Sequence, residues 1–296
     1  MTGLSRRRFL AITAAAALVP TGVAARVSWT GVALGADVRL TVVGDRDAAE
    51  DALVAARRAL AQAERALSLY DPASALSALN RTGALAPPPL LRRTLDLCAT
   101  VHAATKGRFD PTVQPLWRAL ATGGDGAGAR RLVGFERVSL GPRVTLGAGQ
   151  ALTLNGIGQG VATDHVANAL LSRGFSHALV AVGETRGLGG PWRLALADPN
   201  HGNLGLRTLH DGAIATSSPD ALHLGDARHI VDPLGRRAPQ WSTVSVEADG
   251  AGVADGLSTA LCFATDREIR AMGLRHLGVR RVTLVDRDGD LHTVTI

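Results

Sequence analysis

Apolar residues recur along this chain with two different periods, and segments of both kinds are interspersed. A recurrence every three to four residues predicts long helices over residues 46–67, 90–105 and 161–173 and a helical turn over 74–80. Short apolar or alternating runs predict strands over residues 38–43, 138–140, 144–146, 151–154, 178–182, 192–197, 206–209, 213–215, 243–247, 281–286 and 291–296. Residues 256–263 and 267–274 are expected to be helical. Strands clustered among separate helices predict an α+β fold.

Two further features bear on how the chain is organised. A turn signal, Arg287-Asp288-Gly289-Asp290, predicts a hairpin between the last two strands. Neither an internal repeat nor a Pro/Ser linker is present, so residues 26–296 are expected to form one domain of mixed or antiparallel sheets and packed helices. A hydrophobic content of 46% with 20% charged residues is typical of such a globular unit.

The positive charge does not indicate a nucleic-acid partner. The formal net charge is +6, and Lys106 is the only lysine. Apart from Arg6–Arg8, the basic residues are interleaved with acids and form no dense stripe or aromatic platform. We therefore expect no nucleic-acid binding.

The N-terminus predicts export. Arg6, Arg7 and Arg8 precede Phe9 and Leu10, and an apolar run over residues 11–19 is followed by small residues. This run is too short for a membrane span, and the pattern resembles a twin-arginine signal over residues 1–25. An uncleaved anchor is the alternative. The expected location is the periplasm or cell envelope, with membrane contact only through the signal or a partner.

The two cysteines belong to no metal-binding pattern. Cys98 and Cys262 each lie in an apolar stretch and are expected to be small buried residues. A disulfide between them remains an open alternative in an oxidising compartment.

Residues 154–160 place three glycines between a predicted strand and a predicted helix. Glycine lets backbone N–H groups approach a phosphate, and the helix offers its positive end. The spacing fits neither the dinucleotide fingerprint nor the Walker motif. A tight strand-to-helix turn without a ligand explains the segment equally well.

Asp255 and Thr259 lie four residues apart at the start of a predicted helix and therefore share a face. A carboxylate and a hydroxyl at this spacing suit Mg²⁺, which takes a few oxygen ligands and retains waters. The alternative is that Asp255 caps the helix and Thr259 packs inside it.

Other polar groups carry the same ambiguity. His229 precedes a strand that ends in a proline turn, where a histidine could act as a base. Asp232 and Asp110, each before a proline, are either ligand-facing carboxylates or turn residues that accept backbone N–H groups. The hydroxyls of residues 216–218 could bind a ligand or cap a turn.

Taken together, these segments resemble the ApbE family of flavin transferases. The segments that carry the resemblance are LSLYDPASALSALN (67–80), GRFDPTVQPLW (107–117), NGIGQGVATDHVANALL (155–171), AIATSS (213–218), HIVDP (229–233) and ADGLSTAL (254–261), in the family's order. The similarity extends from about Leu34 to the C-terminus.

The resemblance implies an FAD-binding central cleft with Mg²⁺. It places His229 as the catalytic histidine. It implies metal ligation by the Gly156 carbonyl, Asp255, Ser258 and Thr259, and FAD contacts at Leu34, Tyr70, Arg108, Phe109, Asp110, Thr153, Gln159, Thr216 and Ile230. The chain departs from the family at two positions, since the family usually has Asp where Thr153 stands and Lys or Glu where Gln159 stands. Both residues can still hydrogen-bond.

The activity that the resemblance implies is Mg²⁺-dependent transfer of the FMN half of FAD onto a Thr or Ser hydroxyl, with release of AMP. The expected acceptor is a partner flavoprotein of an electron-transfer or respiratory system. Two alternatives remain open: hydrolysis of FAD to FMN and AMP, and a non-catalytic periplasmic FAD-binding protein.

Overall fold

The computed structural model describes residues 25–224 and 227–296. Within these residues, the largest element is a sheet of eight strands in which every neighbouring pair is antiparallel. In order across the sheet, its strands are β1 (Ala25–Ala33), β2 (Ala36–Gly44), β6 (Ala178–Val182), β7 (Glu184–Leu188), β10 (Gly212–Ser217), β13 (Thr243–Ala248), β14 (Val279–Val285) and β15 (Leu291–Thr295). The sequence-based α+β prediction is confirmed.

The remaining described elements are helices and small sheets. The helices are α1 (Arg46–Leu67), α2 (Ala75–Thr82), α3 (Pro89–Ala104), α4 (Gln114–Ala121), α5 (Ala127–Arg130), α6 (Gly158–Leu171), α7 (Ala251–Leu261) and α8 (Asp266–Ala271). The 3-10 turns are η1 (Pro111–Val113), η2 (Phe135–Arg137), η3 (Pro219–Ala221) and η4 (Leu274–Leu277). The small sheets consist of β3 (Ala84–Leu85), β4 (Ser139–Leu140) and β5 (Val144–Thr145), of β8 (Trp192–Asp198) and β9 (Gly202–Leu209), and of β11 (His223–Leu224) and β12 (Ala227–Arg228).

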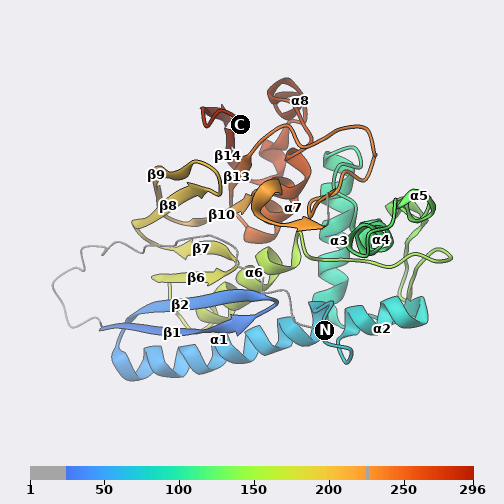
Figure 1. Cartoon of the computed structure of the whole chain (residues 1–296). Helices are drawn as coiled ribbons and strands as arrows, with labels where there is room; N and C mark the ends of the chain where they lie inside the picture. The colour runs from blue at the N-terminus through green and yellow to red at the C-terminus, as the bar shows by residue number, and fades with distance from the viewer. Residues whose placement is uncertain (1–24, 225–226) are drawn as a thin grey trace.

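The main sheet is covered on both faces, and the alternation of side chains along β6 shows how. Ala178, Val180 and Val182 pack in a cluster with α1 and α6, whereas Leu179 packs on the opposite face with the β8–β9 hairpin. Helices thus cover one face of this part of the sheet, and a hairpin covers the other (Figure 1). Because both faces are buried, β6 is apolar throughout rather than alternating.

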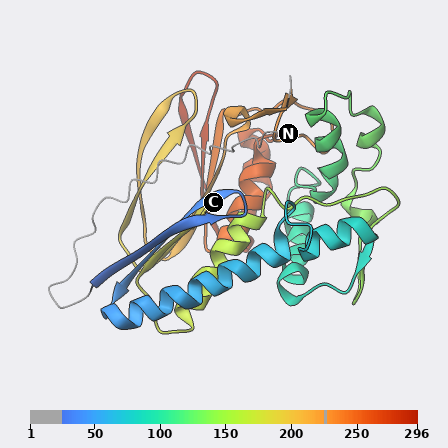
Figure 2. The same cartoon turned by 60° about the horizontal axis from the view of Figure 1, so that its bottom comes forward.

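Helix α1 packs through small side chains. Ala49, Ala52, Ala56, Ala59 and Ala63 are almost fully buried, and the spacing of three to four residues places them on one stripe. Asp45 caps the helix by accepting a hydrogen bond from the N–H of Ala48 at 3.0 Å. Figure 2 shows α1 running along the sheet and leading into the group of helices α2 to α5 beside it. The predicted bounds of α1 are confirmed.

Helices α6 and α7 approach each other unusually closely at Gly160. A Cβ added to Gly160 would lie 2.2 Å from the Ala251 carbonyl oxygen and 2.7 Å from the Asp255 Cβ. Asp164, one turn further along α6, accepts hydrogen bonds from the N–H groups of Ala251 and Gly252, both at 2.9 Å. These are among the N–H groups that have no partner inside α7, so α6 supplies the cap of its neighbour.

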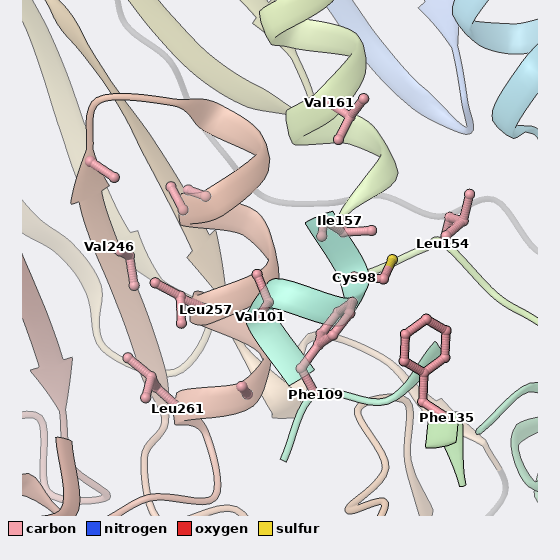
Figure 3. Packing of buried hydrophobic residues seen from close by; sticks show 14 of the residues in the cluster. Cys98, Val101, Phe109, Phe135, Leu154, Ile157, Val161, Val246, Leu257 and Leu261 are labelled. Carbon is pink, nitrogen blue, oxygen red and sulfur yellow. The ribbon is translucent and has the colours of Figure 1, made fainter. Parts of the chain in front are cut away.

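The core beneath this helix pair joins α3, α6 and α7 to the sheet. Figure 3 shows Val101 of α3, Ile157 before α6, and Leu257 and Leu261 of α7 gathered in the same packed space, with Val246 of β13 behind them. Cys98 lies in this cluster, and both it and Cys262 are buried free thiols. Burial raises the pKa of both thiols.

Some predicted elements were wrong or incomplete. Residues 151–154 lack strand structure, and α7 begins at Ala251 rather than at residue 256. The strands β1 and β7 and the helix α4 were not predicted. β1 is an edge strand of the described sheet and pairs with β2, whereas β7 lies between β6 and β10 but is short and carries polar residues, so it lacks a clear apolar run.

The predicted export signal, apart from Ala25, lies outside the described residues, and Ala25 is the first residue of β1. In the part of the chain that the structure describes, no helix combines the length and apolarity required to cross a membrane.

We expect Gly160→Ala to lower the free energy of unfolding by about 1–3 kcal/mol, because the new methyl group would meet α7 backbone. Gly158→Ala is the matched control in the same helix, since its Cβ would lie no closer than 3.4 Å to the side chain of Leu154. Urea denaturation of both variants measures the difference. Equal stability of the two variants would contradict the tight helix contact.

Candidate functional site

A pocket of about 340 Å³ opens where the C-terminal end of β10 meets the loop before α6 and one face of α7. Its lining comes from segments that are far apart in the sequence: residues 108–113, 153–156, 216–222 and 229–233, together with Trp117, Ala197, Pro199 and Thr259. All of the chemically distinctive segments except the 67–80 stretch contribute directly to this one space.

Most of the predicted ligand-binding residues line this pocket. They are Arg108, Phe109, Asp110, Thr153, Gly156, Thr216, His229, Ile230 and Thr259. Asp255 and Ser258 lie just behind the wall and are buried at 1% and 0% exposure. The structure therefore brings together the glycine turn, the hydroxyl run, the histidine and the late helix.

Three predicted FAD contacts lie outside the pocket lining. Tyr70 is largely exposed, and its hydroxyl is 3.3 Å from the side-chain nitrogen of Asn155, a pocket residue. Gln159 donates a hydrogen bond to the carbonyl oxygen of Leu34 at 3.1 Å. Leu34 has a φ of +50° in the turn between β1 and β2, a conformation that is strained for this residue type.

The glycine turn and α7 meet at two points. The hydroxyl of Thr259 lies 3.4 Å from the carbonyl oxygen of Gly156, and Asp255 accepts a hydrogen bond from the N–H of Gly160 at 2.9 Å. The sequence-based interpretation of Asp255 as a residue that opens the helix was wrong, because Asp255 lies one turn inside α7 and Gly250 is the N-cap. The N–H of Gly160, the third glycine of the turn, is directed at the carboxylate of Asp255.

Hydroxyl groups from β10 complete this cluster. Ser217 lies with its Oγ 2.8 Å from that of Ser258 and 3.4 Å from Oγ1 of Thr259. The Ser258 hydroxyl lies 3.0 Å from the carbonyl oxygen of Asp255, to which it can donate a hydrogen bond. Between Ser217 and Ser258, either hydroxyl can be the donor. Thr216 and Ser218 bond across to Ser245 and Thr243, so β13 holds the hydroxyl run in place.

The donor set at this end of the pocket fits a hard divalent cation. Asp255 supplies a carboxylate, Gly156 a carbonyl oxygen, and Ser217 and Thr259 hydroxyl oxygens. Mg²⁺ prefers oxygen ligands and is commonly held by one or two carboxylates together with substrate phosphates and waters. The absence of thiol or imidazole groups among these donors makes zinc a poorer match.

Asp110 and Asp232, each followed by a proline, are turn residues. Asp110 accepts hydrogen bonds from the N–H groups of Thr112 at 2.8 Å and Phe135 at 3.0 Å. Asp232 accepts from the N–H groups of Leu234, Arg236 and Arg237 at 3.0, 2.6 and 2.9 Å. Both carboxylates therefore hold turns, and Asp110, which also lines the pocket, shapes the pocket loop.

His229 is oriented by its backbone neighbours. Its Nδ1 lies 3.0 Å from the carbonyl oxygen of Leu222. The indole N–H of Trp117 donates a hydrogen bond to the backbone carbonyl oxygen of His229 at 3.1 Å. Because a carbonyl can only accept, Nδ1 carries the proton in this hydrogen bond, so the neutral ring has its lone pair on Nε2. A neutral imidazole in this tautomer can receive a proton at Nε2.

Arg108 is the cationic group of the pocket, and Glu268 holds it. The Arg108 guanidinium is 2.7 Å from Glu268, whose other oxygen is 2.6 Å from Arg237. The backbone N–H of Thr265, together with Arg237, Thr265 Oγ1 and Arg108, lowers the pKa of Glu268 to about 2. Glu268 is therefore ionised at all pH values well above 2, and the Arg108 contact persists across the physiological range.

Sequence reasoning missed Glu184. This residue of β7 is 1% exposed, and its carboxylate accepts a hydrogen bond from the N–H of Thr216 at 3.0 Å. It thereby fixes the strand that carries the hydroxyl run. A carboxylate directly after the apolar run of β6 was the signal available in the sequence, since buried carboxylates require hydrogen-bond partners.

Several solved structures share the fold. The apo flavinyl transferase ApbE of Pseudomonas stutzeri superposes with a TM-score of 0.78 at 25% identity and covers 94% of this chain and 96% of that one. The ApbE protein of Thermotoga maritima gives a TM-score of 0.80 at 23% identity, covering 90% and 96%. The flavin transferase ApbE of Vibrio cholerae gives 0.78 at 23% identity, covering 92% and 97%.

Sequence comparison gives the same relationship. The FAD:protein FMN transferase of Klebsiella pneumoniae (strain 342) is 28% identical over 270 residues, which cover 78% of this chain and 76% of that protein. The protein of the same name from Escherichia coli (strain K12) is 26% identical over 262 residues, covering 77% and 74%. The model of the ApbE family matches residues 34–281, and the chain therefore belongs to the ApbE family.

Proposed function

We propose that this protein is an FAD:protein FMN transferase that depends on Mg²⁺ and modifies a Thr or Ser hydroxyl of a partner flavoprotein. The observation that carries the proposal is the cluster formed by Gly156, Ser217, Asp255 and Thr259 at one end of a pocket that also holds Arg108 and His229. Membership of the ApbE family and relatives named FAD:protein FMN transferase support it.

The pocket offers complementary groups for the parts of FAD. Phe109, Trp117 and Ile230 provide apolar surfaces that suit flat rings, and the hydroxyl run and the Thr153 side chain provide hydrogen-bonding groups. The guanidinium of Arg108, held by Glu268, is suited to an anionic phosphate. In this proposal, FAD lies in the cleft with its pyrophosphate toward the oxygen cluster.

Asp255, Thr259 and the Gly156 carbonyl would hold Mg²⁺. Ser258 lies beside them and is hydrogen-bonded to Ser217. When bound, Mg²⁺ neutralises negative charge that develops on the phosphates. The protein itself contributes position. Asp255 is fixed by the Gly160 N–H and Thr259 is fixed by α7, so neither group must reorganise when the reaction occurs.

Transfer requires an acceptor hydroxyl to attack the phosphorus of the FMN half. A bond forms between the hydroxyl oxygen and that phosphorus, the bond to the AMP oxygen breaks, and AMP leaves. The hydroxyl proton needs a recipient. His229 lines the pocket, and its neutral tautomer with the proton on Nδ1 can accept a proton at Nε2. His229 is the residue that we assign to this step.

We also propose that the protein is exported through the twin-arginine pathway and acts in the periplasm or cell envelope, where its acceptor is an electron-transfer or respiratory flavoprotein. The proposal is supported by Arg6–Arg8 and the short apolar run that follows.

The function is tested by incubating purified protein with FAD, Mg²⁺ and a threonine-bearing flavoprotein subunit that lacks its flavin. We expect the acceptor to become covalently fluorescent and AMP to appear in equal amount, because each transfer releases one AMP. FMN and AMP without a modified acceptor would instead indicate hydrolysis. Unchanged FAD bound to the protein would indicate a non-catalytic flavin-binding protein.

Asp255→Asn is expected to lower Mg²⁺-dependent FAD turnover at least about hundredfold, because it removes the single carboxylate of the cation cluster. The asparagine oxygen can still accept the Gly160 N–H, so the variant separates metal binding from helix packing. Turnover at varied Mg²⁺ concentrations measures the effect. Wild-type turnover at limiting Mg²⁺ would remove Asp255 from the ligand set.

His229→Gln is expected to slow FMN transfer by about 10²–10⁴-fold while FAD affinity changes little, because the ring acts on the acceptor proton rather than in binding. Single-turnover transfer and quenching of flavin fluorescence measure the two quantities separately. A transfer rate equal to that of the wild type would rule out the chemical role. Loss of FAD binding alone would make His229 a binding residue.

A further inference from the structure

A second hollow lies on the other side of the segment that carries His229. It has a volume of about 440 Å³ and is lined by Arg130 at the end of α5, by Arg228 at the end of β12, and by Arg236 and Arg237 further along the chain. Its floor includes the apolar side chains of Leu120, Ile230 and Phe263. We call this hollow the arginine groove.

The charges of the groove are only partly neutralised. Arg228 pairs with Asp220, and Arg237 pairs with Glu268 at 2.6 Å. Arg130 donates to the backbone carbonyl oxygen of Asp232 at 3.3 Å and Arg236 is exposed, and neither forms an ion pair within residues 25–224 and 227–296. Two guanidinium groups at this groove therefore lack a carboxylate partner in the described part of the chain.

The acid at the groove does not supply that partner. Asp232 is 8% exposed, and both of its oxygens accept backbone N–H groups of the turn that follows. Its negative charge is therefore directed into the turn rather than toward the arginine side chains. The exposed rim of the groove has a positive balance, although basic and acidic residues are interleaved elsewhere along the chain.

One chain segment separates the groove from the candidate active site and lines both of them. Ile230 and Val231 line both the arginine groove and the pocket, and His229 directly precedes them on the pocket side. A polypeptide seated in the groove would therefore lie next to the histidine that we assign to the acceptor proton.

We propose that the arginine groove docks an acidic segment of the acceptor protein and so brings the acceptor hydroxyl to His229. This inference rests on the proposed transferase function and names the surface by which the partner is recognised. An apolar floor with an arginine rim suits a peptide that combines apolar and carboxylate side chains, because guanidinium groups pair with carboxylates in a forked geometry. FAD occupies the pocket on the opposite side of the segment in this arrangement.

The test compares the binding of two fluorescein-labelled peptides, one of six aspartates and one of six asparagines, by fluorescence anisotropy at low ionic strength. The protein variants are wild type, Arg130→Glu combined with Arg236→Glu, and Arg58→Glu combined with Arg173→Glu. The last pair is matched in charge change, and both of its arginines are exposed, one in the middle of α1 and one just after α6. Quenching of flavin fluorescence measures FAD affinity for each protein.

We expect the wild type to prefer the aspartate peptide and the groove variant to bind it about tenfold more weakly, because two exposed positive charges at the groove are reversed. The matched variant should retain binding, and all three proteins should bind FAD equally. Equal weakening in the matched variant would show general attraction to a basic protein and overturn the proposal. So would a wild type without preference between the peptides, or a groove variant that loses FAD.

The two proposals fail in different ways. A wild type that binds the aspartate peptide in the groove but neither binds nor converts FAD would refute the transferase function and leave the groove as a binding surface for acidic segments. A wild type that transfers FMN while its groove variant binds peptide normally would refute only the docking proposal.

Discussion

The contact between the first turn of α6 and α7 is the constraint on which the candidate site depends. The lack of a side chain at Gly160 lets its backbone lie against Ala251, and its N–H then reaches the carboxylate of Asp255. Asp164 caps α7 from the same helix. Because the helices are fixed to each other in this way, the Gly156 carbonyl oxygen and the Thr259 hydroxyl are 3.4 Å apart. Oxygen donors held by packed helices in this manner are pre-organised.

A second layer of polar contacts holds the rest of the pocket. Glu184 binds the backbone of Thr216, and Asp110 and Asp232 each accept backbone N–H groups of the segments that follow them. These carboxylates are largely buried and satisfied by N–H groups, so they shape the pocket rather than supply its charge. The charged groups available to a ligand are then Arg108 and the Asp255 carboxylate on the pocket side and the arginines on the groove side. This division suits a protein that must hold a nucleotide on one side of a segment and a protein partner on the other.

Local pattern was sufficient for much of the fold. The extent of α1 and the buried run of β6 are set by nearest neighbours in sequence, and both were predicted with the bounds observed. Residues 151–154 were predicted as a strand because they are mostly apolar, but they pair with no described strand. Instead, the N–H of Thr153 donates a hydrogen bond to the carbonyl oxygen of Pro111 in the pocket loop. β1 and β7 were missed although each pairs with the strand next to it in the sequence: β1 is a half-exposed edge strand, and β7 is short and carries Glu184, Thr185 and Arg186. The start of α7 was placed too late because its cap, Asp164, lies on another helix.

The sequence by itself determined the family resemblance, the α+β class and the residue types available for oxygen coordination, because these follow from local pattern and from the order of the motifs. Only the tertiary structure decided which of those residues meet. The third glycine of the turn looked like a phosphate-binding position but is required by helix contact, and the aspartates before proline turned out to bind backbone. Distances between residues that are remote in the chain are set by packing and by the hydrogen bonds of buried polar groups. Both depend on several segments at once, so no single segment of the sequence determines them.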